Sequence, residues 1–383
     1  MSRCAWTKTT LGDQLTFQRG FDITKDEQSD GPYPVYSSSG PKSTHFEYKL
    51  EGPGLIIGRK GTLGSAFFEE GRYWPHDTTL WVKDFRGNDA KFAYYFVQTM
   101  HFEQYDAGAS NPSLNRNHIH SIPILWPSLE EQRRIAGILS AYDDLIENCQ
   151  RRIRILEEMA RSLYREWFVH FRYPGHESVP RVLHTLGLES VLAPPGWDVR
   201  QLKDVCQEVR RNVPKGALNE LVPYVGLEHI PRRSMALDDW ETTSELGSNK
   251  LEFRQGEVLF GKIRPYFHKV SVAPFDGLCS ADTIVIRAKQ PKYSALVTAL
   301  VSSDGFVAQS VASSNGSKMP RANWHVLEKT LFFVPPERLL EQFSDVFDVA
   351  IREQQILVRQ AHNLRQTRDL LLKKLLLSSP SRD

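Results

Sequence analysis

Basic residues recur in two glycine-flanked turns of the sequence, where they could bind phosphate groups. The turn RKGTLG at 59–64 follows the apolar run LIIG, and GKIRPYFHK at 261–269 follows VLF. Glycines beside such cations let a backbone approach a phosphate closely. The alternative is a plain hairpin turn with solvated charges, but the recurrence favours phosphate binding. The candidate residues are Arg59, Lys60 and Thr62 in the first turn and Lys262, Arg264 and Tyr266 in the second.

Two later loops are rich in serine, asparagine and basic residues, and these side chains could read base edges. Asn can pair with adenine and Arg with guanine, at roughly 1 to 3 kcal/mol of discrimination per good pair. For any single Ser or Asn the more ordinary role is to form a turn. The candidates are Ser110, Asn111, Ser113, Asn115 and Arg116 in the first loop and Ser314, Asn315, Lys318 and Arg321 in the second.

Signatures of catalysis and of metal binding are weak. His118 and His120 form H-x-H without a third ligand nearby, so we expect strand residues on one face rather than a metal site. The Asp77-Thr78 and Asp282-Thr283 pairs are interpreted as turn or strand-start devices. We find no phosphate-binding GxxxxGK[ST] motif, no dinucleotide loop and no Asn-Pro-Pro-aromatic motif. The sequence therefore predicts no catalytic, cofactor-binding or metal-binding residue in this chain.

Two long amphipathic helices, at 129–170 and 337–378, must position these turns. Ser128 and Glu131 form a capping-box pattern at the start of the first helix. Its expected seam has 3-4 spacing with a one-residue slip after Cys149. The expected seam residues of this helix are Ile135, Ile138, Tyr142, Leu145, Cys149, Ile153, Leu156, Ala160, Leu163 and Trp167. Those of the second are Leu340, Phe343, Phe347, Ala350, Leu357, Ala361, Leu364, Leu371 and Leu375, interrupted by Gln354 and Arg368.

The two helices favour an intramolecular, antiparallel coiled coil. Each would be about 60 Å long at 1.5 Å per residue, which suits a spacer of fixed length. Gln354 and Arg368 would then fix the register or contact another subunit. The alternative is two unrelated helices, each packed on its own globular core.

The globular segments are mixed α/β (α+β), and the chain reads as a tandem duplication. Residues 1–128 precede the first helix, 171–196 form a proline-rich linker, and 197–336 precede the second helix. WDVRQLKDV after the linker corresponds to WTKTTLGDQL near the start, and CSADTIVIRA corresponds to PHDTTLWVK. Ordered matches of this kind indicate duplication. The second globular segment is the longer one, and the two have diverged, as expected if they recognise different things.

Composition excludes a bulk polycation and gives no sign of a membrane protein. The 383 residues carry a net charge of +2, so a nucleic-acid role must rest on local basic surfaces. The four cysteines are too widely separated for a zinc site or a disulfide framework, which favours a reducing compartment. The sequence starts without a signal-peptide pattern, and LLLKKLLL is split by two lysines. We therefore expect a cytoplasmic protein without a membrane contact.

The block PSLEEQRRIAGILSAYDDLIENCQRRIRILEEMARSLYREWF, placed between two globular segments and followed by a second long helix, resembles the specificity subunit of a type I restriction-modification system. This resemblance implies two target recognition domains that read an asymmetric, bipartite site in double-stranded DNA. It also implies helices that dock two methyltransferase (modification) subunits, and restriction/translocase subunits that cut. S-adenosylmethionine, ATP and Mg are then expected in those partner subunits, and this chain is expected to be non-catalytic.

Two other classes of function stay open at this point. A stand-alone DNA-modifying enzyme would need the cofactor motifs that the sequence lacks. A coiled-coil adaptor without DNA contact would require that Lys60, Arg116 and Lys318 contribute nothing to DNA affinity.

Overall fold

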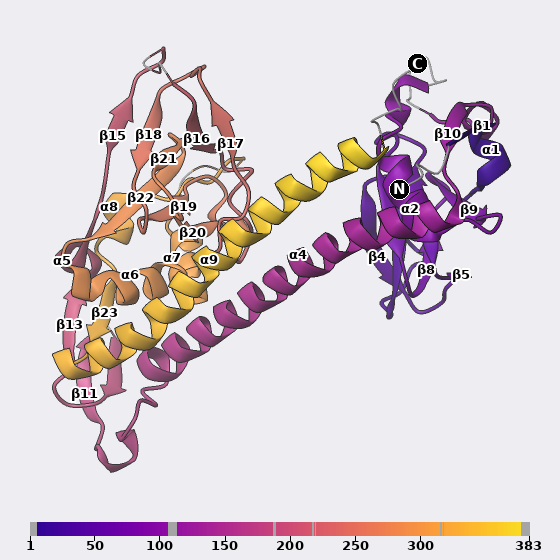
Figure 1. Ribbon diagram of the computed structural model, residues 1–383. Helices are drawn as coiled ribbons and strands as arrows, with labels where there is room; N and C mark the ends of the chain where they lie inside the picture. The colour runs from indigo at the N-terminus through magenta and orange to yellow at the C-terminus, as the bar shows by residue number, and fades with distance from the viewer. Residues whose placement is uncertain are drawn as a thin grey trace. The chain divides into compact units, whose positions relative to one another are not determined.

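The computed structural model describes residues 6–105, 113–186, 189–216, 218, 220–314, 316 and 318–376. Contacts divide the chain into two compact units (Figure 1). The first unit comprises Met1–Leu145 and Leu364–Asp383, and the second comprises Ile146–Asn363. Each unit therefore contains a globular part together with one end of each long helix.

The first unit contains three small sheets, in which β3 and β8 form the parallel pair. One sheet pairs β1 (Thr7–Thr10) with β10 (Pro123–Trp126). The second has the order β2 (Thr16–Arg19), β9 (Thr79–Asp84), β6 (Gly54–Gly58), β7 (Ala66–Glu69). The third has the order β4 (Gly40–His45), β3 (Tyr33–Ser37), β8 (Arg72–Pro75), β5 (Leu50–Glu51). The helices are α1 (Leu11–Gln14), α2 (Ala90–Gln98), the 3₁₀ turn η1 (Phe102–Tyr105) and α3 (Arg116–His120).

The core of the first unit lies between the β6–β9 sheet and α2. The apolar run of β6 is buried along its whole length, as expected for a strand covered on both faces. Asp89 caps α2, whose inner face contributes Phe92 and Phe96. The end of the second long helix completes this core with Leu371, Leu372, Leu375 and Leu376.

The second unit repeats this strand order. β13 (Asp198–Gln201) pairs with β23 (Leu331–Val334). The next sheet has the order β14 (Cys206–Glu208), β22 (Thr283–Ala288), β19 (Val258–Gly261), β20 (Val270–Val272). The third has the order β15 (Arg211–Val213), β18 (Lys250–Phe253), β21 (Gly277–Ser280), β16 (Val222–Val225), β17 (Glu241–Thr243). The helices are α5 (Leu202–Val205), η4 (Pro265–Phe267), η5 (Pro291–Tyr293), α6 (Ser294–Val301), α7 (Asp304–Ala312) and α8 (Trp324–Leu327).

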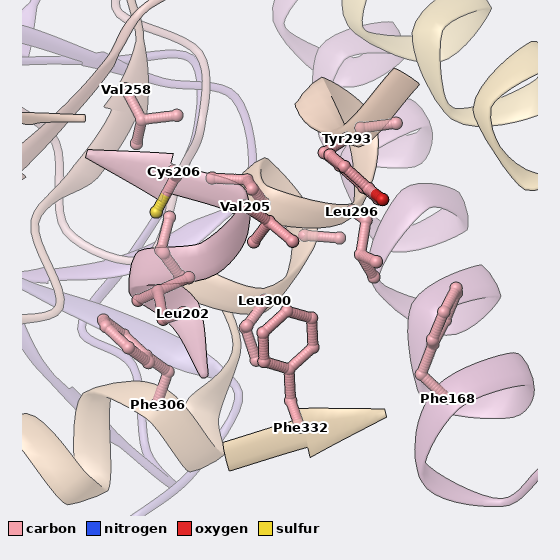
Figure 2. Packing of buried hydrophobic residues seen from close by; sticks show 14 of the residues in the cluster. Phe168, Leu202, Val205, Cys206, Val258, Tyr293, Leu296, Leu300, Phe306 and Phe332 are labelled. Carbon is pink, nitrogen blue, oxygen red and sulfur yellow. The ribbon is translucent and has the colours of Figure 1, made fainter. Parts of the chain in front are cut away.

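Matching pairs confirm the predicted duplication. The parallel pair of β16 with β21 corresponds to that of β3 with β8, and the β14–β22–β19–β20 sheet corresponds to β2–β9–β6–β7. Strand β15 is an addition in the second unit, in keeping with the greater length of that segment. Figure 2 shows the core of this unit, where Leu202 and Val205 of α5 pack near Leu296 and Leu300 of α6.

Residues 171–196, predicted as a linker of partly ordered character, contain regular structure. After a short 3₁₀ turn, η3 (His176–Ser178), they form the antiparallel hairpin β11 (Val182–Leu186) and β12 (Glu189–Ala193). Ala193 is buried in the core of the second unit, whereas Leu183 and Leu192 lie opposite each other on the exposed face. From Leu183 to Leu186, exposed and half-buried residues alternate, which is the pattern of a strand with one face toward the protein.

The two predicted long helices are present. Helix α4 covers Leu129–Tyr164 and continues as a π-helix, η2, at Arg165–Val169; α9 covers Glu337–Leu376. In the first unit, Ile135 and Leu139 of α4 share a core with the end of α9. In the second unit, Phe168 of η2 packs against Phe343 near the start of α9, with ring centroids 4.7 Å apart. Within each unit the two chain segments are thus antiparallel, as predicted.

The register of the α4 seam differs from the prediction. Leu139 and Ile146 are buried, whereas Ile138 is half-buried and Leu145 is 50% exposed. The buried series therefore continues without the expected slip. It comprises Ile135, Leu139, Tyr142, Ile146, Cys149, Ile153, Leu156, Ala160, Leu163 and Trp167, in which Tyr142, Leu156 and Leu163 are half-buried. An uninterrupted 4-3 spacing is what a heptad seam requires.

The polar residues in the α9 seam are part of the packing. Arg368 Nη1 lies 2.6 Å from Asp143 Oδ1 of α4, and the Tyr95 hydroxyl donates to the other oxygen of Asp143 at 2.5 Å. Burial and the Asp143 carboxylate raise the pKa of Tyr95, so its hydroxyl stays protonated. This network supports the predicted register role for Arg368. Gln354 is buried, and its Nε2 has no hydrogen-bond partner within the described part of the chain.

Among the described helices, none by itself is long and apolar enough to cross a membrane. Two consecutive helical segments, Pro291–Val301 and Asp304–Ala312, are together long and apolar enough to do so, but they are bent by 66° relative to each other.

Leu139→Ala should destabilise the first unit far more than Leu145→Ala. The first change leaves a cavity in a fully buried site and should cost about 2 to 5 kcal/mol, whereas the exposed leucine should cost about 0.5 kcal/mol or less. Urea unfolding of the two matched variants measures this difference. A larger loss for Leu145→Ala would instead support the register expected from the sequence.

Candidate nucleic-acid interface

In the first unit the basic turn and the polar loop lie side by side. Lys60 and Ser113 form an isolated antiparallel bridge, and the Leu114 N–H donates to the Arg59 carbonyl at 2.9 Å. Leu114 is fully buried and fixes the end of the loop in the core. Two stretches that are more than 50 residues apart in the sequence therefore form one surface.

The second unit contains the same arrangement. Ile263 and Arg321 form an isolated antiparallel bridge, and the Ala322 N–H donates to the Lys262 carbonyl at 2.9 Å. The Arg264 N–H donates to the Pro320 carbonyl at 2.8 Å, and Ala322 is buried as Leu114 is. We call these two surfaces, 59–64 with 113–116 and 262–268 with 318–325, the turn-loop surfaces.

A carboxylate organises the cations of the first turn-loop surface. Asp77, with 13% of its side chain exposed, lies 2.6 Å from Arg19 Nη2 and 3.3 Å from Lys60 Nζ. Burial alone would raise the pKa of Asp77, but the hydrogen bonds from Arg19 and Lys60 lower it below its usual range. The carboxylate therefore stays ionised and holds both cations at the surface. Arg59 also points to this site, since its Nη1 donates to the Asp77 carbonyl at 3.3 Å.

The second turn-loop surface has its own carboxylates. Arg321 Nη1 lies 3.6 Å from Asp282 Oδ1, and Arg210 Nε lies 3.0 Å from Glu208 Oε1. Beside them is a cavity of about 300 Å³, which is lined by Lys262, Arg321, Asn323, His325 and Arg210 among others. The lining combines these polar and basic side chains with Glu208, Ile284, Ala322 and Trp324.

Arg19 and Arg210 are not among the candidate residues predicted from the sequence. Arg19 is the last residue of β2 and pairs with Leu80 of β9, and Arg210 comes two residues after the end of the equivalent strand β14. Alignment of the two copies could have revealed this recurrence. Asp77 and Asp282 do not occupy equivalent positions in the two units. Asp77 comes two residues before the first residue of β9, whereas Asp282 comes one residue before the first residue of the equivalent strand β22.

Asn115 has a structural role. Its side-chain oxygen accepts from the Asn117 N–H at 3.0 Å and caps α3, and Asn323 caps α8 in the same way at 3.1 Å. By these contacts Asn115 corresponds to Asn323, and Ser113 corresponds to Arg321. The prediction that His118 and His120 are strand residues is wrong: both belong to α3, and His120 Nε2 accepts from the Phe17 N–H at 2.9 Å.

The other predicted residues have different locations. Thr62 closes the first turn, where a Cβ on Gly58 would lie 2.1 Å from the Thr62 carbonyl oxygen. Tyr266 and Lys318 are exposed on the second surface. Ser314 donates to the Val311 carbonyl at 2.7 Å just beyond α7. Ser110, Asn111 and Asn315 lie outside the described residues.

Asp22, His76 and Asp77 bring three potential metal-ligand atoms within 4.8 Å of one another. Arg19 and Lys60 already bond the Asp77 carboxylate, and His76 Nδ1 lies 3.0 Å from the Thr78 hydroxyl. We interpret this group as part of the ion-pair network of the turn.

Comparisons with known proteins agree on one family. Residues 5–158 match the model of the type I restriction modification DNA specificity domain. The chain is 26% identical over 308 residues to the type I restriction enzyme MjaIX specificity subunit of Methanocaldococcus jannaschii, covering 75% of this chain and 68% of that protein. By these matches the chain is similar to the type I restriction-modification specificity subunits.

Two further relatives agree with this. The EcoDI specificity subunit of Escherichia coli is 21% identical, with 74% of this chain and 68% of that protein covered. The crystal structure of a type I restriction-modification S subunit from M. genitalium has the same fold, with a TM-score of 0.65, 15% identity, and 100% and 98% coverage. The part of this chain that matches the family model, residues 5–158, resembles a DNA specificity domain.

Asn115→Ala should cost about 1 kcal/mol of stability through the lost cap, and Asn115→Ser should retain most of it because serine also caps helices. Urea unfolding measures the cost, and Asn117→Ala on the exposed face of α3 is the matched control. If Asn115 read a base, the serine variant would also lose sequence discrimination in a DNA competition assay.

Proposed function

We propose that this chain is the DNA specificity subunit of a type I restriction-modification complex, in which each globular unit reads one half of a split DNA site through its turn-loop surface. The observation that supports this most strongly is the recurrence of the same bridge, with its basic residues, in both units. Cations on such a surface bind phosphates and set the orientation of the protein, whereas flat polar groups read base edges. The candidate contacts are Arg19, Arg59 and Lys60 in the first unit and Arg210, Lys262, Arg264, Tyr266, Lys318 and Arg321 in the second.

The proposed half-sites differ because the two surfaces differ. In the first unit a single carboxylate, Asp77, holds two cations. In the second unit Asp282 and Glu208 each hold one cation, and the exposed Tyr266 adds an aromatic ring. Unlike side chains at equivalent positions favour different bases, so the whole site is expected to be asymmetric and bipartite.

The two long helices are proposed to fix the unread spacer between the half-sites. A separation near one helical turn of DNA, about 34 Å, would place both half-sites on one face of the duplex. The ion pair of Arg368 with Asp143 would resist sliding of α9 along α4, because a shift would leave both charges unpaired.

Partner subunits are proposed to dock on the outer faces of the helices. Ile155 and Met159 of α4, and Val346, Val349 and Ile356 of α9, are exposed although apolar. Two modification subunits bound there would supply S-adenosylmethionine and flip the target adenine from the duplex. Restriction/translocase subunits would supply the ATP- and Mg-dependent steps, all in the cytoplasm with the host DNA.

Deletion of this chain from its native host should abolish N6-methyladenine at one split, asymmetric motif. Sequencing that detects this base, in intact and deleted strains, gives the result and reads the target directly. Complementation with the Arg19→Ala/Lys60→Ala variant should reduce the base preference in only one half of the methylated motif. Identical methylation in both strains would contradict the proposal.

Insertion of one heptad into each long helix should lengthen the unread spacer and leave both half-sites unchanged, because seven residues preserve the seam. Methylation of a plasmid library with randomised spacers by the reconstituted complex measures the preferred length. Insertion of seven residues into only one helix is the control and should abolish methylation. An unchanged spacer length in the protein with both helices extended would refute the proposal that the helices set this length.

A further inference from the structure

The segment 262–268 carries the candidate DNA contacts of the second unit in an unusual backbone conformation. Arg264 and His268 have φ angles of 51° and 52°, which residues other than glycine adopt rarely. The short helix η4 lies between them, and Tyr266 within it is half exposed. Such a conformation persists when surrounding contacts over-determine it.

His268 supplies such contacts from the end of the segment. It is 4% exposed, and its Nε2 lies 2.9 Å from the Ser302 carbonyl oxygen in the connection between α6 and α7. Because a carbonyl only accepts, Nε2 is the protonated nitrogen. On the other side, the His268 carbonyl accepts the Arg233 N–H at 2.8 Å. The end of the segment is therefore held through both its ring and its backbone.

The Arg233 contact continues to the long helix α4. Arg161 Nη2 donates to the Arg233 carbonyl, and the Arg233 side chain lies 3.1 Å from Asp304 of α7. One turn earlier in α4, the buried Glu157 carboxylate accepts the Met235 and Ala236 N–H groups at 2.5 and 3.0 Å. Residues 233–236 are thus fixed to α4, and His268 is fixed to them.

The turn of the first unit, 59–64, contains no histidine, and backbone hydrogen bonds close it. The Gly64 N–H donates to the Gly58 carbonyl at 3.0 Å, and the Gly58 N–H donates to the Ser65 carbonyl at 2.9 Å. Its positive φ angles fall on Gly61 and Gly64, where they cost little. The anchored histidine is therefore a feature of the second turn.

We infer that His268 is a positioning residue for DNA recognition by the second unit, which holds 262–267 against the α6–α7 connection and, through 233–236, against α4. A buried ring does not contact DNA, so His268 acts through Lys262, Arg264 and Tyr266. This inference rests on the proposed function, since it supposes that these three residues contact DNA.

The test is methylation of a randomised DNA library by the reconstituted complex with its modification subunits. Sequencing of N6-methyladenine then gives the base preference in each half-site separately. His268→Leu should reduce the preference in the half-site of the second unit by about tenfold, the scale of one lost base contact, and leave the other half unchanged. His268→Gln, whose amide can donate to the Ser302 carbonyl, should retain most of the preference.

His184 offers a matched control in the same unit. Its Nε2 also lies within hydrogen-bond distance of a backbone carbonyl, that of Pro194 at 3.2 Å, but it belongs to the β11–β12 hairpin. His184→Leu should leave both half-sites unchanged. The Lys262→Ala/Arg264→Ala variant identifies the half-site that the second unit reads.

A pH profile gives a second readout. The charged groups facing His268 are Arg161 of α4, Arg233 of the 233–236 segment and Asp304 of α7. Burial, together with the two arginines, lowers the pKa of His268. Its neutral form therefore supports the native segment above the ordinary pKa, about 6.5, and this support falls as the pH drops through that value. Wild-type preference in the second half-site should weaken toward pH 5.5, and His268→Gln should not show this weakening.

Unchanged preference in His268→Leu, or equal relaxation of both halves, would overturn the positioning role. In that case a half-site relaxed by Lys262→Ala/Arg264→Ala would still support the proposed function. If the lysine-arginine variant changes neither half, the proposed interface is wrong, and the inference about His268 falls with it.

Discussion

The heptad seam of α4 and α9 is the constraint on which both units depend. In each unit, apolar residues from one end of each helix enter a core that also contains strands and short helices. In each unit one core thus joins the helix ends to the globular part, so the basic turns are carried by rigid elements. The ion pair of Arg368 with Asp143 restricts the register of the seam, because it forms at one alignment of the two helices.

Partly buried carboxylates give the turn-loop surfaces their geometry. Asp77, Asp282 and Glu208 lie behind cations that the chain would otherwise leave on long, flexible side chains. Holding a cation in place lowers the entropy lost on binding, but it also reduces the net positive charge of the surface. This balance agrees with the near-neutral charge of the whole chain and favours specificity over bulk affinity.

The sequence predicted the long helices, the duplication and the basic turns, because each depends on local spacing or on recurrence. It did not predict the α4 register correctly: Ile138 and Leu139 are equally apolar, and only the partner helix decides which is buried. Similarly, Asn115 is of a residue type that can read bases, but in the structure it caps α3. That helix has five residues and is too short to show a periodic pattern in the sequence. The contact of His268 with Ser302 joins residues 34 positions apart and has no local signal.

The contribution of Leu371, Leu372, Leu375 and Leu376 to the core of the first unit has a consequence for biosynthesis. Chains emerge from the ribosome from the N-terminal end, and domains commonly fold in that order. Here the first unit to be translated lacks part of its core until α9 has been made, whereas all of the second unit precedes residue 364. The unit that is translated first is therefore expected to be the last to reach its final stability.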